Sequence, residues 1–489
     1  MGQAKIGLIG LAVMGANLAR NLAGKQIATL VYNRTEAKTR QFMQAFGSDA
    51  NLTAAYSLEE LVEKLERPRK MILMVKAGAP VDALLDKLLP LLDKGDIVID
   101  GGNSFFEDTR RRHARLAEQG IEFVGMGVSG GEEGALHGPS LMPGGSEKVF
   151  LQLEPILRAI AAKAGHSGQE PCVTYIGQDG AGHYVKMVHN GIEYADMQLI
   201  ADTSTVMRCI LHMTTEEMAA VWEQWNHSEL SSYPVSYLVE ITAQILRKKD
   251  SATGLPMVDV IQDVAGQKGT GKWTGQNALE LGIPVPTITE AVFARTMSAQ
   301  KEGRLALEEI YCSLPGRKTA QEEQTKALFS PQEKEALLED LRHTLYGAKI
   351  CAYAQGFNLL HGAASAYGWK LDMAAIAKIW RGGCIIRAGF LDDVSAAFSE
   401  KPGLSNLLSC PFFAEALRSA RPGWGRVVAL AVEQGIPVVA LSSALSYFDA
   451  YRTARSNACL LQAQRDYFGA HTYQRVDREG VFHTEWTEA

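Results

Sequence analysis

Residues 4–15 read AKIGLIGLAVMG, a short apolar run that leads directly into a glycine-rich turn. The run 4–9 is expected to be a buried strand, and the pattern Gly10-x-Ala12-x-x-Gly15 follows it. In dinucleotide-binding βαβ units the first position makes a tight turn, a small second residue admits the pyrophosphate, and the third allows close helix packing. The alternative is a short secretory signal peptide, because a lysine precedes the apolar residues. The glycine spacing favours the nucleotide-binding fold.

The residues after the next strand choose between the two nicotinamide cofactors. A helix is expected near 17–23, with the pyrophosphate at its N-terminus, and a second strand at 28–32. NAD enzymes usually carry an acidic residue after this strand for the ribose 2′-hydroxyl. This chain has Asn33, Arg34 and Thr35, which offer hydrogen-bond donors and a positive charge. Such groups suit a 2′-phosphate, so the sequence predicts NADP rather than NAD.

The α/β alternation continues to about residue 178. Buried strands are expected at 71–75, 96–100 and 121–124, and a last strand at 172–176 closes the sheet. The first three end in polar or glycine-rich turns, where doubly wound sheets bind their ligands. One of these turns, Ser129-Gly130-Gly131, is able to present amides and a hydroxyl to a carboxylate. An ordinary tight turn is the alternative interpretation of that loop.

Length and composition exclude several classes of protein. The 489 residues suggest two to three domains, and 46% hydrophobic with 21% charged residues is typical of globular proteins. The net charge of −6 gives no sign of a nucleic-acid or membrane partner. No apolar run approaches the roughly 18 residues of a transmembrane helix. Seven scattered cysteines without a CxxC pair argue against disulfides or zinc, and indicate reduced thiols in the cytoplasm.

The stretch GAGHYVKMVHNGIEY at 180–194 places unusual chemistry on one helical face. As a helix it aligns Lys186, His189, Asn190, Glu193 and Tyr194 in a stripe over two turns. A solvated polar face with incidental Lys–Glu pairing is the alternative. Five different functional groups that directly follow a nucleotide-binding half favour a catalytic helix.

The chain beyond residue 180 reads as helical and repeats itself. The motif AxExGIPV at 278–285 recurs 153 positions later, and the motif at 218–221 recurs 155 positions later. Two matches at nearly one spacing predict a duplicated all-helical domain. A shift of the polar stripe by 155 gives Leu341, Thr344, Leu345, Ala348 and Lys349. The second copy therefore lacks the polar set, which favours a function for the first.

Two later segments carry further candidates. Residues 267–274 read QKGTGKWT, which lacks the P-loop spacing and a preceding strand, so an NTPase is excluded. Lys268 and Thr270 are still candidates for binding a phosphate group. Arg295, on a helix expected from about 289, adds a bidentate hydrogen-bond donor. Solvated surface charges are the alternative for each cation. The polar, aromatic segment 462–473 is expected to dock on its own chain or on a neighbour.

These motifs together resemble those of decarboxylating 6-phosphogluconate dehydrogenases over essentially the full length of the chain. The resemblance rests on GLAVMG at 10–15, NRT at 33–35, VSGGEEG at 128–134, GHYVKMVHNGIEY at 182–194, IQDVAGQKGTGKW at 261–273 and QAQRDYFGAHT at 462–472. The last two are the most specific. The chain departs from the family at 456–459, where SNAC replaces the usual Leu-Pro-Ala-Asn at the start of the tail.

The resemblance implies a homodimer that converts 6-phospho-D-gluconate and NADP⁺ to D-ribulose 5-phosphate, CO₂ and NADPH without a metal. It implies that Lys186 is the general base and Glu193 the general acid. It implies substrate carboxylate and hydroxyl contacts by Asn103, Ser129, Gly130, Gly131, His189 and Asn190. Phosphate contacts fall on Tyr194, Lys268, Thr270 and Arg295, with Arg465 and His471 of the partner subunit. Cofactor contacts fall on Gly10, Ala12, Val13, Met14, Gly15, Asn33, Arg34, Thr35, Val75, Lys76, Ala77 and Asn103.

The expected organisation is an NADP-binding Rossmann-like domain at 1–178, a helical substrate and dimerisation domain at 179–440, and a C-terminal helix and tail at 441–489 that reaches the partner. Two rival functions stay open at this point. A β-hydroxyacid dehydrogenase for an unphosphorylated acid would have no use for Lys268, Arg295 and Arg465. A non-catalytic NADP-binding regulator need not keep Lys186 with Glu193.

Overall fold

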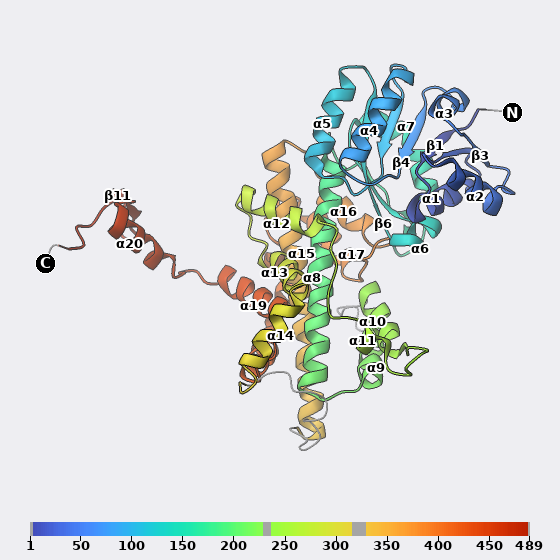
Figure 1. The fold of residues 1–489 in the computed structure, drawn as a ribbon. Helices are drawn as coiled ribbons and strands as arrows, with labels where there is room; N and C mark the ends of the chain where they lie inside the picture. The colour runs from blue at the N-terminus through green and yellow to red at the C-terminus, as the bar shows by residue number, and fades with distance from the viewer. Residues whose placement is uncertain (1–2, 228–235, 315–328, 488–489) are drawn as a thin grey trace.

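The N-terminal part of the computed structural model, which describes residues 3–227, 236–314 and 329–487, is built on a seven-stranded sheet (Figure 1). The strand order is β3-β2-β1-β4-β5-β6-β7, and all neighbours are parallel except β6 and β7. The strands are β1 (Ile6–Ile9), β2 (Thr29–Tyr32), β3 (Leu52–Ala54), β4 (Lys70–Leu73), β5 (Ile97–Asp100), β6 (Glu122–Ser129) and β7 (Ser140–Pro143). The first six follow the order of a doubly wound dinucleotide-binding fold, as predicted.

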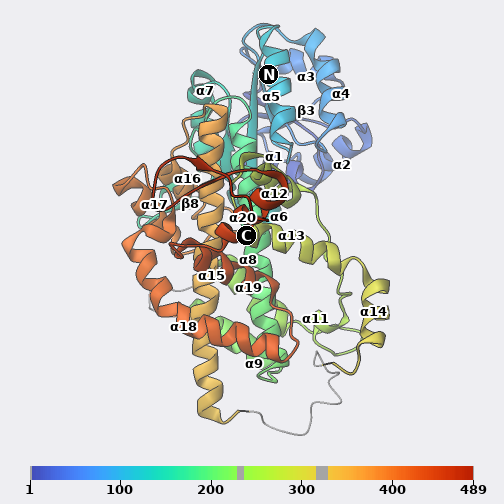
Figure 2. The same ribbon diagram turned by 90° about the vertical axis from the view of Figure 1, so that its left-hand side faces the viewer.

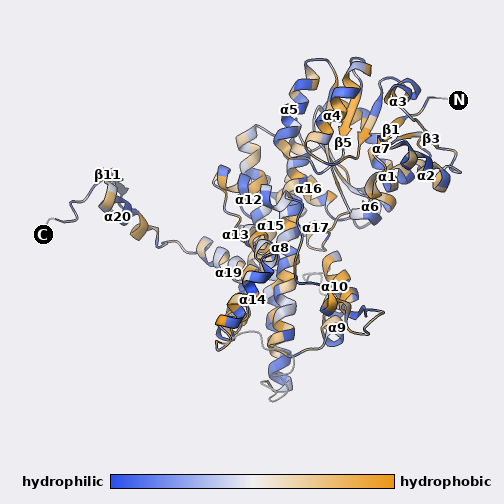
Figure 3. Ribbon diagram, in the orientation of Figure 1, coloured by the Kyte–Doolittle hydropathy of each residue, from blue (hydrophilic) through white to orange (hydrophobic). Residues whose placement is uncertain are grey.

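Helices cover both faces of this sheet, so its strands are apolar on both sides. Leu8 of β1 lies in one apolar cluster and its neighbour Ile9 lies in the cluster on the other face. Strands buried on both faces read as continuous hydrophobic runs, which Figure 3 shows as orange arrows. The covering helices are α1 (Val13–Gly24), α2 (Glu36–Phe46), α3 (Leu58–Lys64), α4 (Ala79–Leu88), α5 (Phe106–Ala117), α6 (Gly131–His137) and α7 (Glu147–Ile160).

The prediction of a last strand at 172–176 is wrong. The segment lies beside β7, because Leu141 N donates to Cys172 O and Ile176 N donates to Pro143 O, each at 2.9 Å. It forms only an isolated bridge, between Val173 and Leu141, so the last strand of the sheet is β7. β7 pairs antiparallel with the second half of β6, from Met126 to Ser129. This pairing extends β6 well beyond the predicted 121–124, and it makes Ser129 the end of a paired strand. Two short strands, β8 (Lys163–Ala164) and β9 (Glu170–Pro171), form a separate hairpin.

Two long helices form the axis of the remaining chain. α8 (Ala181–Cys209) and α15 (Pro331–Tyr367) run side by side, as Figures 1 and 2 show. A Cβ on Gly356 of α15 would lie 2.4 Å from Ile192 of α8, so the two helices touch closely there. The helices around them are α9 (Thr215–Asn226), α10 (Tyr237–Arg247), α11 (Met257–Val260), α12 (Thr270–Leu281), α13 (Pro286–Ser298), α14 (Lys301–Ile310), α16 (Met373–Ile379), α17 (Leu391–Glu400), α18 (Pro411–Glu433) and α19 (Val439–Tyr451).

The two copies of the repeated AxExGIPV motif have the same conformation. The first ends α12 at Gly282, with φ 67°, before α13 begins. The second ends α18 near Gly435, with φ 66°, before α19 begins. A left-handed residue after a helix favours glycine, which explains why both copies keep it. Within the described ranges, no helix is both long and apolar enough to cross a membrane.

The C-terminal tail stands clear of the rest of the chain (Figure 1). It consists of α20 (Ala458–Gly469) and a hairpin of β10 (Tyr473–Gln474) and β11 (Val481–Phe482). Leu460, Leu461 and Phe468 of α20 are 62%, 59% and 72% exposed. Apolar side chains on an isolated helix are typical of a surface that another chain covers.

Candidate active site

Two glycines let helix α8 approach the sheet. A Cβ on Gly182 of α8 would lie 2.3 Å from the carbonyl oxygens of Gly125 and Met142, on strands β6 and β7. A Cβ on Gly127 of β6 would lie 2.5 Å from the Cβ of Lys186. Both separations are shorter than any real contact, so α8 packs directly on the backbone of β6 and β7. This contact brings Lys186 to the carboxyl end of β6.

Lys186 lies in a buried set of hydrogen bonds. Its Nζ donates to Ser129 Oγ at 3.0 Å and to Asn190 Oδ1 at 2.8 Å, and it lies 3.4 Å from His189 Nδ1. The residue is 6% exposed. Burial lowers the pKa of Lys186, and the nearby Glu193 only partly opposes this effect. A neutral amine is therefore accessible at lower pH than for a solvated lysine.

The remaining polar residues of the α8 stripe are also inside the protein, which rules out the solvated-face interpretation. His189 and Asn190 are buried, and His189 Nε2 lies 3.2 Å from Ser129 Oγ. Asn190 Nδ2 donates to Thr270 Oγ1 at 3.2 Å, in the first turn of α12. Burial, with the charge of Lys186, holds the pKa of His189 well below its usual value. The imidazole is therefore neutral and serves as a hydrogen-bonding group.

Glu193 is the second ionisable group of the stripe. Its side chain is 21% exposed, and Oε2 lies 4.0 Å from His189 Nδ1. Burial raises the pKa of Glu193, although Lys186, Arg295 and Lys268 lower it in part. Lys186 and Glu193 thus have pKa values displaced in opposite directions by the same dry environment. Pairs of this kind occur where acid–base chemistry is performed.

Cations and a helix N-terminus gather beyond Glu193. Arg295 of α13 lies over the Tyr194 ring, with Cζ 3.5 Å from the centroid. Lys268 lies in the loop before α12, and Thr270 is the first residue of that helix. Free amides at a helix start and nearby cations suit a phosphate group. α13 begins at Pro286 rather than near 289, since proline is favoured in the first helical turn.

The predicted cofactor residues line a pocket of about 640 Å³ at the carboxyl ends of β1, β2 and β4. A Cβ on Gly10 would lie 2.4 Å from Met74 O, and one on Gly15 would lie 1.9 Å from Gly10 O. Glycine is thus required at both positions to form this cradle. Of the predicted cofactor residues, the pocket lining includes Gly10, Ala12, Asn33, Arg34, Thr35, Val75 and Lys76. Val13, Met14, Gly15, Ala77 and Asn103 lie in the adjoining turns and in α1.

Two basic residues of this pocket were not predicted. Lys38 lies in the first turn of α2, and Lys87 lies on α4. Lys38 is close in sequence to Arg34, a signal that the sequence contained; Lys87 is brought in only by the packing of α4. Asn33 is engaged within the protein, because its Oδ1 accepts from Leu11 N at 3.1 Å. The residues present fit a dinucleotide that carries an additional phosphate.

A buried arginine ties the cofactor pocket to the catalytic side of the sheet. Arg112 of α5 is fully buried and donates two hydrogen bonds, of 2.9 and 2.8 Å, to Asp82 of α4. It also donates to Gly78 O at 3.0 Å, and its Nη1 lies 3.6 Å from Asp100 Oδ2. Asp100 in turn accepts from Gly102 N at 3.0 Å. The Arg112 guanidinium therefore contacts the turns after β4 and β5. The turn after β5 carries Asn103, one of the predicted site residues.

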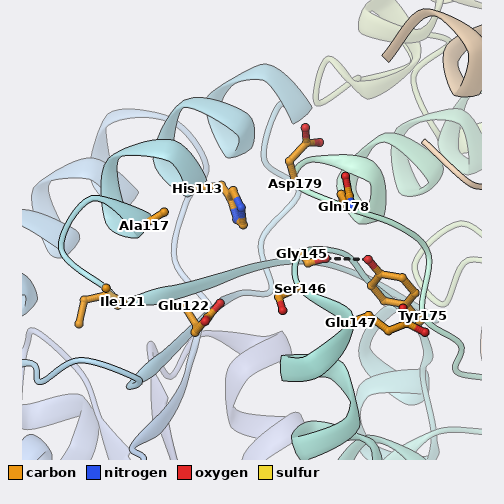
Figure 4. Close-up of a pocket in the computed structure, with 11 residues that line it drawn as sticks. His113, Ala117, Ile121, Glu122, Gly145, Ser146, Glu147, Tyr175, Gln178 and Asp179 are labelled. Carbon is orange, nitrogen blue, oxygen red and sulfur yellow. Dashed lines mark hydrogen bonds between the residues drawn. The ribbon is translucent and has the colours of Figure 1, made fainter. Parts of the chain in front are cut away.

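A second pocket, of about 570 Å³, lies elsewhere on the N-terminal domain. Figure 4 shows its lining, with the carboxylates of Glu122, Glu147 and Asp179 around His113 and Tyr175. None of the residues predicted as site residues lines it. Its acidic character does not suit a phosphorylated acid.

The structure does not bring Arg465 and His471 to this site within one chain. Both lie on the tail, which projects away from α8 in Figure 1. Asn103 lies in the turn after β5 and is exposed. Gly130, which follows Ser129, and Gly131, the first residue of α6, have positive φ of 114° and 63°. The other predicted substrate residues surround Lys186 and Glu193 as described.

Comparison with known proteins agrees with this geometry. Residues 5–177 match the family described as "NAD binding domain of 6-phosphogluconate dehydrogenase", and 182–486 match "6-phosphogluconate dehydrogenase, C-terminal domain". Two Bacillus subtilis relatives, the NADP(+)-dependent and the NAD(+)-dependent decarboxylating 6-phosphogluconate dehydrogenases, are 52% and 51% identical, each over 99% of this chain and over 100% and 99% of their own. The structure of Plasmodium falciparum 6-phosphogluconate dehydrogenase, solved in its apo form and in complexes with NADP⁺ and with 6-phosphogluconate, superposes with a TM-score of 0.91 at 43% identity, covering 99% of this chain and 100% of that one. The chain therefore belongs to the 6-phosphogluconate dehydrogenase family.

Proposed function

We propose that this chain oxidises and decarboxylates 6-phospho-D-gluconate with NADP⁺, releasing D-ribulose 5-phosphate, CO₂ and NADPH. The observation that carries the proposal is the pairing of Lys186 and Glu193 on one buried face of α8. Burial lowers the pKa of the first and raises that of the second. The reaction needs a base for a hydroxyl proton and an acid for a carbon atom, and these two groups supply both.

Lys186 performs the first proton transfer. Its amine, which burial makes easier to deprotonate, accepts the proton of the substrate 3-hydroxyl, while Ser129 and Asn190 hold Nζ in place. NADP⁺, when bound, accepts the hydride that leaves C3. The Lys186 ammonium then donates a hydrogen bond to the new C3 oxygen. That bond stabilises the enediol formed when CO₂ departs, in a site where water does not screen the charge.

Glu193 completes the reaction. Its carboxyl group, whose protonated form burial favours, delivers a proton to C1 of the enediol, and this yields the ketose phosphate. His189 lies between the two catalytic groups, 3.4 Å from Lys186 Nζ and 4.0 Å from Glu193 Oε2. Its neutral imidazole is suited to hydrogen-bond the substrate rather than to take the proton.

The substrate lies along α8, with its carboxylate toward the sheet and its phosphate toward α13. Ser129, Gly130, Gly131, Asn103, His189 and Asn190 contact its carboxylate and hydroxyls, and Tyr194, Lys268, Thr270 and Arg295 contact its phosphate. This orientation is supported by the cations around the start of α12 and by the position of Arg295 over Tyr194. An unphosphorylated hydroxy acid would leave those cations without a ligand.

The cofactor is NADP rather than NAD. The two Bacillus subtilis relatives name different cofactors at nearly equal identity, so overall identity does not distinguish them. The pocket decides, because Arg34, Lys38, Lys76 and Lys87 line it and no acidic residue does. An excess of positive charge favours the 2′-phosphate of NADP.

The working unit is a homodimer whose tails are exchanged, so that Arg465 and His471 of the partner subunit complete the phosphate site. The exposed apolar residues of α20 and the projection of the tail (Figure 1) support this assembly. The domains predicted from the sequence are 1–178, 179–440 and 441–489; because α19 spans Val439–Tyr451 and packs on α8, α13 and α15, we propose that the helical domain extends to the end of α19. The scattered cysteines, which form no CxxC motif, favour a cytoplasmic location.

A steady-state assay tests the proposal. Absorbance of NADPH and release of CO₂ are followed with 6-phosphogluconate, and again with an unphosphorylated hydroxy acid or with NAD⁺. Lys186→Ala is expected to lower kcat by about 100-fold or more. NADP affinity, measured by fluorescence titration, is expected to stay near that of the wild type. Lys148→Ala, which removes an exposed lysine on α7, is the matched control. A Lys186→Ala enzyme that keeps more than about a tenth of kcat contradicts the base assignment.

A further inference from the structure

The tail is organised around one buried carboxylate. Asp466 is fully buried, and it is the only buried residue of α20. Its neighbours Tyr467 and Phe468 are 61% and 72% exposed. A helix that faces water on nearly every side usually buries an apolar residue if it buries any, so a lone buried aspartate requires a reason.

Four donors from the tail converge on Asp466. Its Oδ1 accepts from Thr472 N at 2.9 Å and lies 2.9 Å from His483 Nδ1. Its Oδ2 accepts from Thr484 N at 3.0 Å and from Trp486 Nε1 at 2.8 Å. Burial raises the pKa of Asp466, but these hydrogen bonds outweigh that effect and lower the pKa to about 2. The carboxylate is thus ionised at all physiological pH values. It links α20 to the residue before β10 and to the residues after β11.

The same contacts fix the backbone on both sides of His471. Ala470 and Thr472 have φ of 48° and 61°, a left-handed conformation that residues other than glycine adopt only when their surroundings impose it. Thr472 is held by Asp466 through its N–H and by Gln462 Nε2, 2.6 Å away, through its carbonyl. Gln462 Oε1 also accepts from Arg465 Nη1 at 3.1 Å. Arg465 is hydrogen-bonded to Gln462, and His471 is the chain neighbour of Thr472. Both residues are therefore tied to the hydrogen bonds around Asp466.

We propose that Asp466 is a positioning residue, which sets the geometry of Arg465 and His471 before the tail reaches the partner's phosphate site. Asp466 itself does not touch the substrate. A tail already folded around the Asp466 carboxylate presents Arg465 and His471 together. Substrate binding then does not have to include the entropy cost of ordering a flexible segment. This inference rests on the proposed function, because it requires that the two residues bind the substrate phosphate in trans.

Two substitutions test the inference, one that changes the Asp466 carboxylate itself and one that removes a single hydrogen bond to it. Asp466→Asn keeps the size of the side chain but removes the charge and turns one acceptor into a donor. Trp486→Phe keeps the ring and removes only one N–H that reaches Asp466. Asp477→Asn is the matched control, because Asp477 lies in the same tail, is exposed and pairs only locally with Arg475.

The readout is the Michaelis constant for each substrate, with dimer mass checked by light scattering. Asp466→Asn is expected to raise KM for 6-phosphogluconate by about 10-fold or more, the range for loss of a charged hydrogen bond. KM for NADP and the dimer mass are expected to stay unchanged, since the cofactor pocket lies in the other domain. Trp486→Phe is expected to act in the same direction and more weakly. In the Asp466→Asn background, Arg465→Met is expected to cost less than in the wild type, because the two residues act together.

Different outcomes separate the two proposals. A wild-type dimer that does not turn over 6-phosphogluconate would overturn the proposed function and this inference with it. An active wild type with Asp466→Asn equal to Asp477→Asn would overturn the inference alone. It would also fail if Asp466→Asn were monomeric, since the carboxylate would then serve assembly, or if KM rose equally for both substrates.

Discussion

Lys186 and Glu193, the base and the acid of the proposed mechanism, share one buried environment. They lie seven positions apart on α8, so two helical turns place them on the same face. Burial disfavours the charged form of each, and the pKa of the lysine falls while that of the glutamate rises. Their mutual attraction opposes both shifts. Burial therefore has a larger effect on both pKa values than the attraction between the two residues.

A bell-shaped pH profile follows from these opposite shifts. Lys186 must be neutral to accept a proton, so kcat/KM rises with pH as the lysine loses its proton at a pKa below the ordinary value. Glu193 must be protonated to donate, so activity falls again as pH passes its raised pKa. Glu193→Gln is expected to lower kcat and to remove the alkaline limb. A Glu193→Gln profile with the wild-type shape would contradict the acid assignment; pH-rate profiles with 6-phosphogluconate and NADP provide the measurement.

At the scale of elements, the seating of α8 on β6 and β7 positions the chemistry. The backbone of β6 lies against the first turns of α8 because Gly127 and Gly182 present no side chain. The hydrogen bond from Lys186 to Ser129 joins the two elements at the point where β6 ends. Anything that separates the helix from the strand separates the base from its partner.

Gly127→Ala tests this seating. The new methyl group would lie 2.5 Å from Lys186 Cβ, so the helix or the strand must shift. We expect a loss of about 1–3 kcal/mol in the free energy of unfolding, with a marked fall in kcat. Gly303→Ala on α14 is the control, because a Cβ there meets nothing within 4 Å, and it is expected to be neutral or slightly stabilising. Urea unfolding with steady-state kinetics provides both readouts, and equal behaviour of the two variants would contradict the prediction.

The Arg112 network connects α5 with the turns after β4 and β5. Arg112→Met leaves Asp100, which is fully buried, without its nearby cation. We expect a loss of about 3–5 kcal/mol in unfolding free energy, the usual effect of removing one partner of a buried pair. KM for NADP is expected to rise, because Gly78 O loses its donor.

The neighbouring arginine offers a matched control. Arg111 also pairs with Asp82, but its side chain is 53% exposed. Arg111→Met is therefore expected to change stability by no more than about 1 kcal/mol and to leave KM for NADP unchanged. Thermal unfolding of both variants measures the change in stability, and steady-state titration with NADP measures the change in KM. An Arg112→Met protein as stable as Arg111→Met would mean that Asp100 has another charge partner.

At the scale of the whole molecule, the chain holds two residues of the proposed phosphate site away from the rest of that site. The tail carries Arg465 and His471 away from α8, and its apolar residues remain exposed. Exchange of tails between two copies would cover those residues and complete the site at once. The proposal thus explains two features of the structure with one assembly.

Mixed dimers test tail exchange directly. Lys186→Ala and Arg465→Met homodimers are each expected to be nearly inactive. When the two chains are co-expressed in equal amounts, half of the dimers are mixed, and each has one site with a native lysine and a native partner tail. Activity is then expected to recover to about a quarter of the wild-type value. Absence of recovery in mixed dimers of confirmed composition would show that Arg465 acts within its own chain.

Much of the fold was predictable because its signals are local. The spacing of Gly10, Ala12 and Gly15 reports a backbone turn, and the stripe from Lys186 to Tyr194 reports helical geometry, so neither needs knowledge of distant residues. The repeated motif at Gly282 and Gly435 likewise reports two equivalent helix ends.

Other features depend on partners far away in the chain, and only the tertiary structure decided them. β7 is a strand because it pairs continuously with the end of β6, whereas 172–176 contacts β7 without a continuous ladder. Lys349, which takes the place of Tyr194 in the second repeat, is buried against Asp196 of α8, 153 positions away in sequence. Desolvation is also a property of the folded environment: the same lysine on an exposed helix would keep its ordinary pKa. The sequence by itself determined which groups are available and on which helical face, and the packing of α8 against the sheet decided that they are dry enough to act.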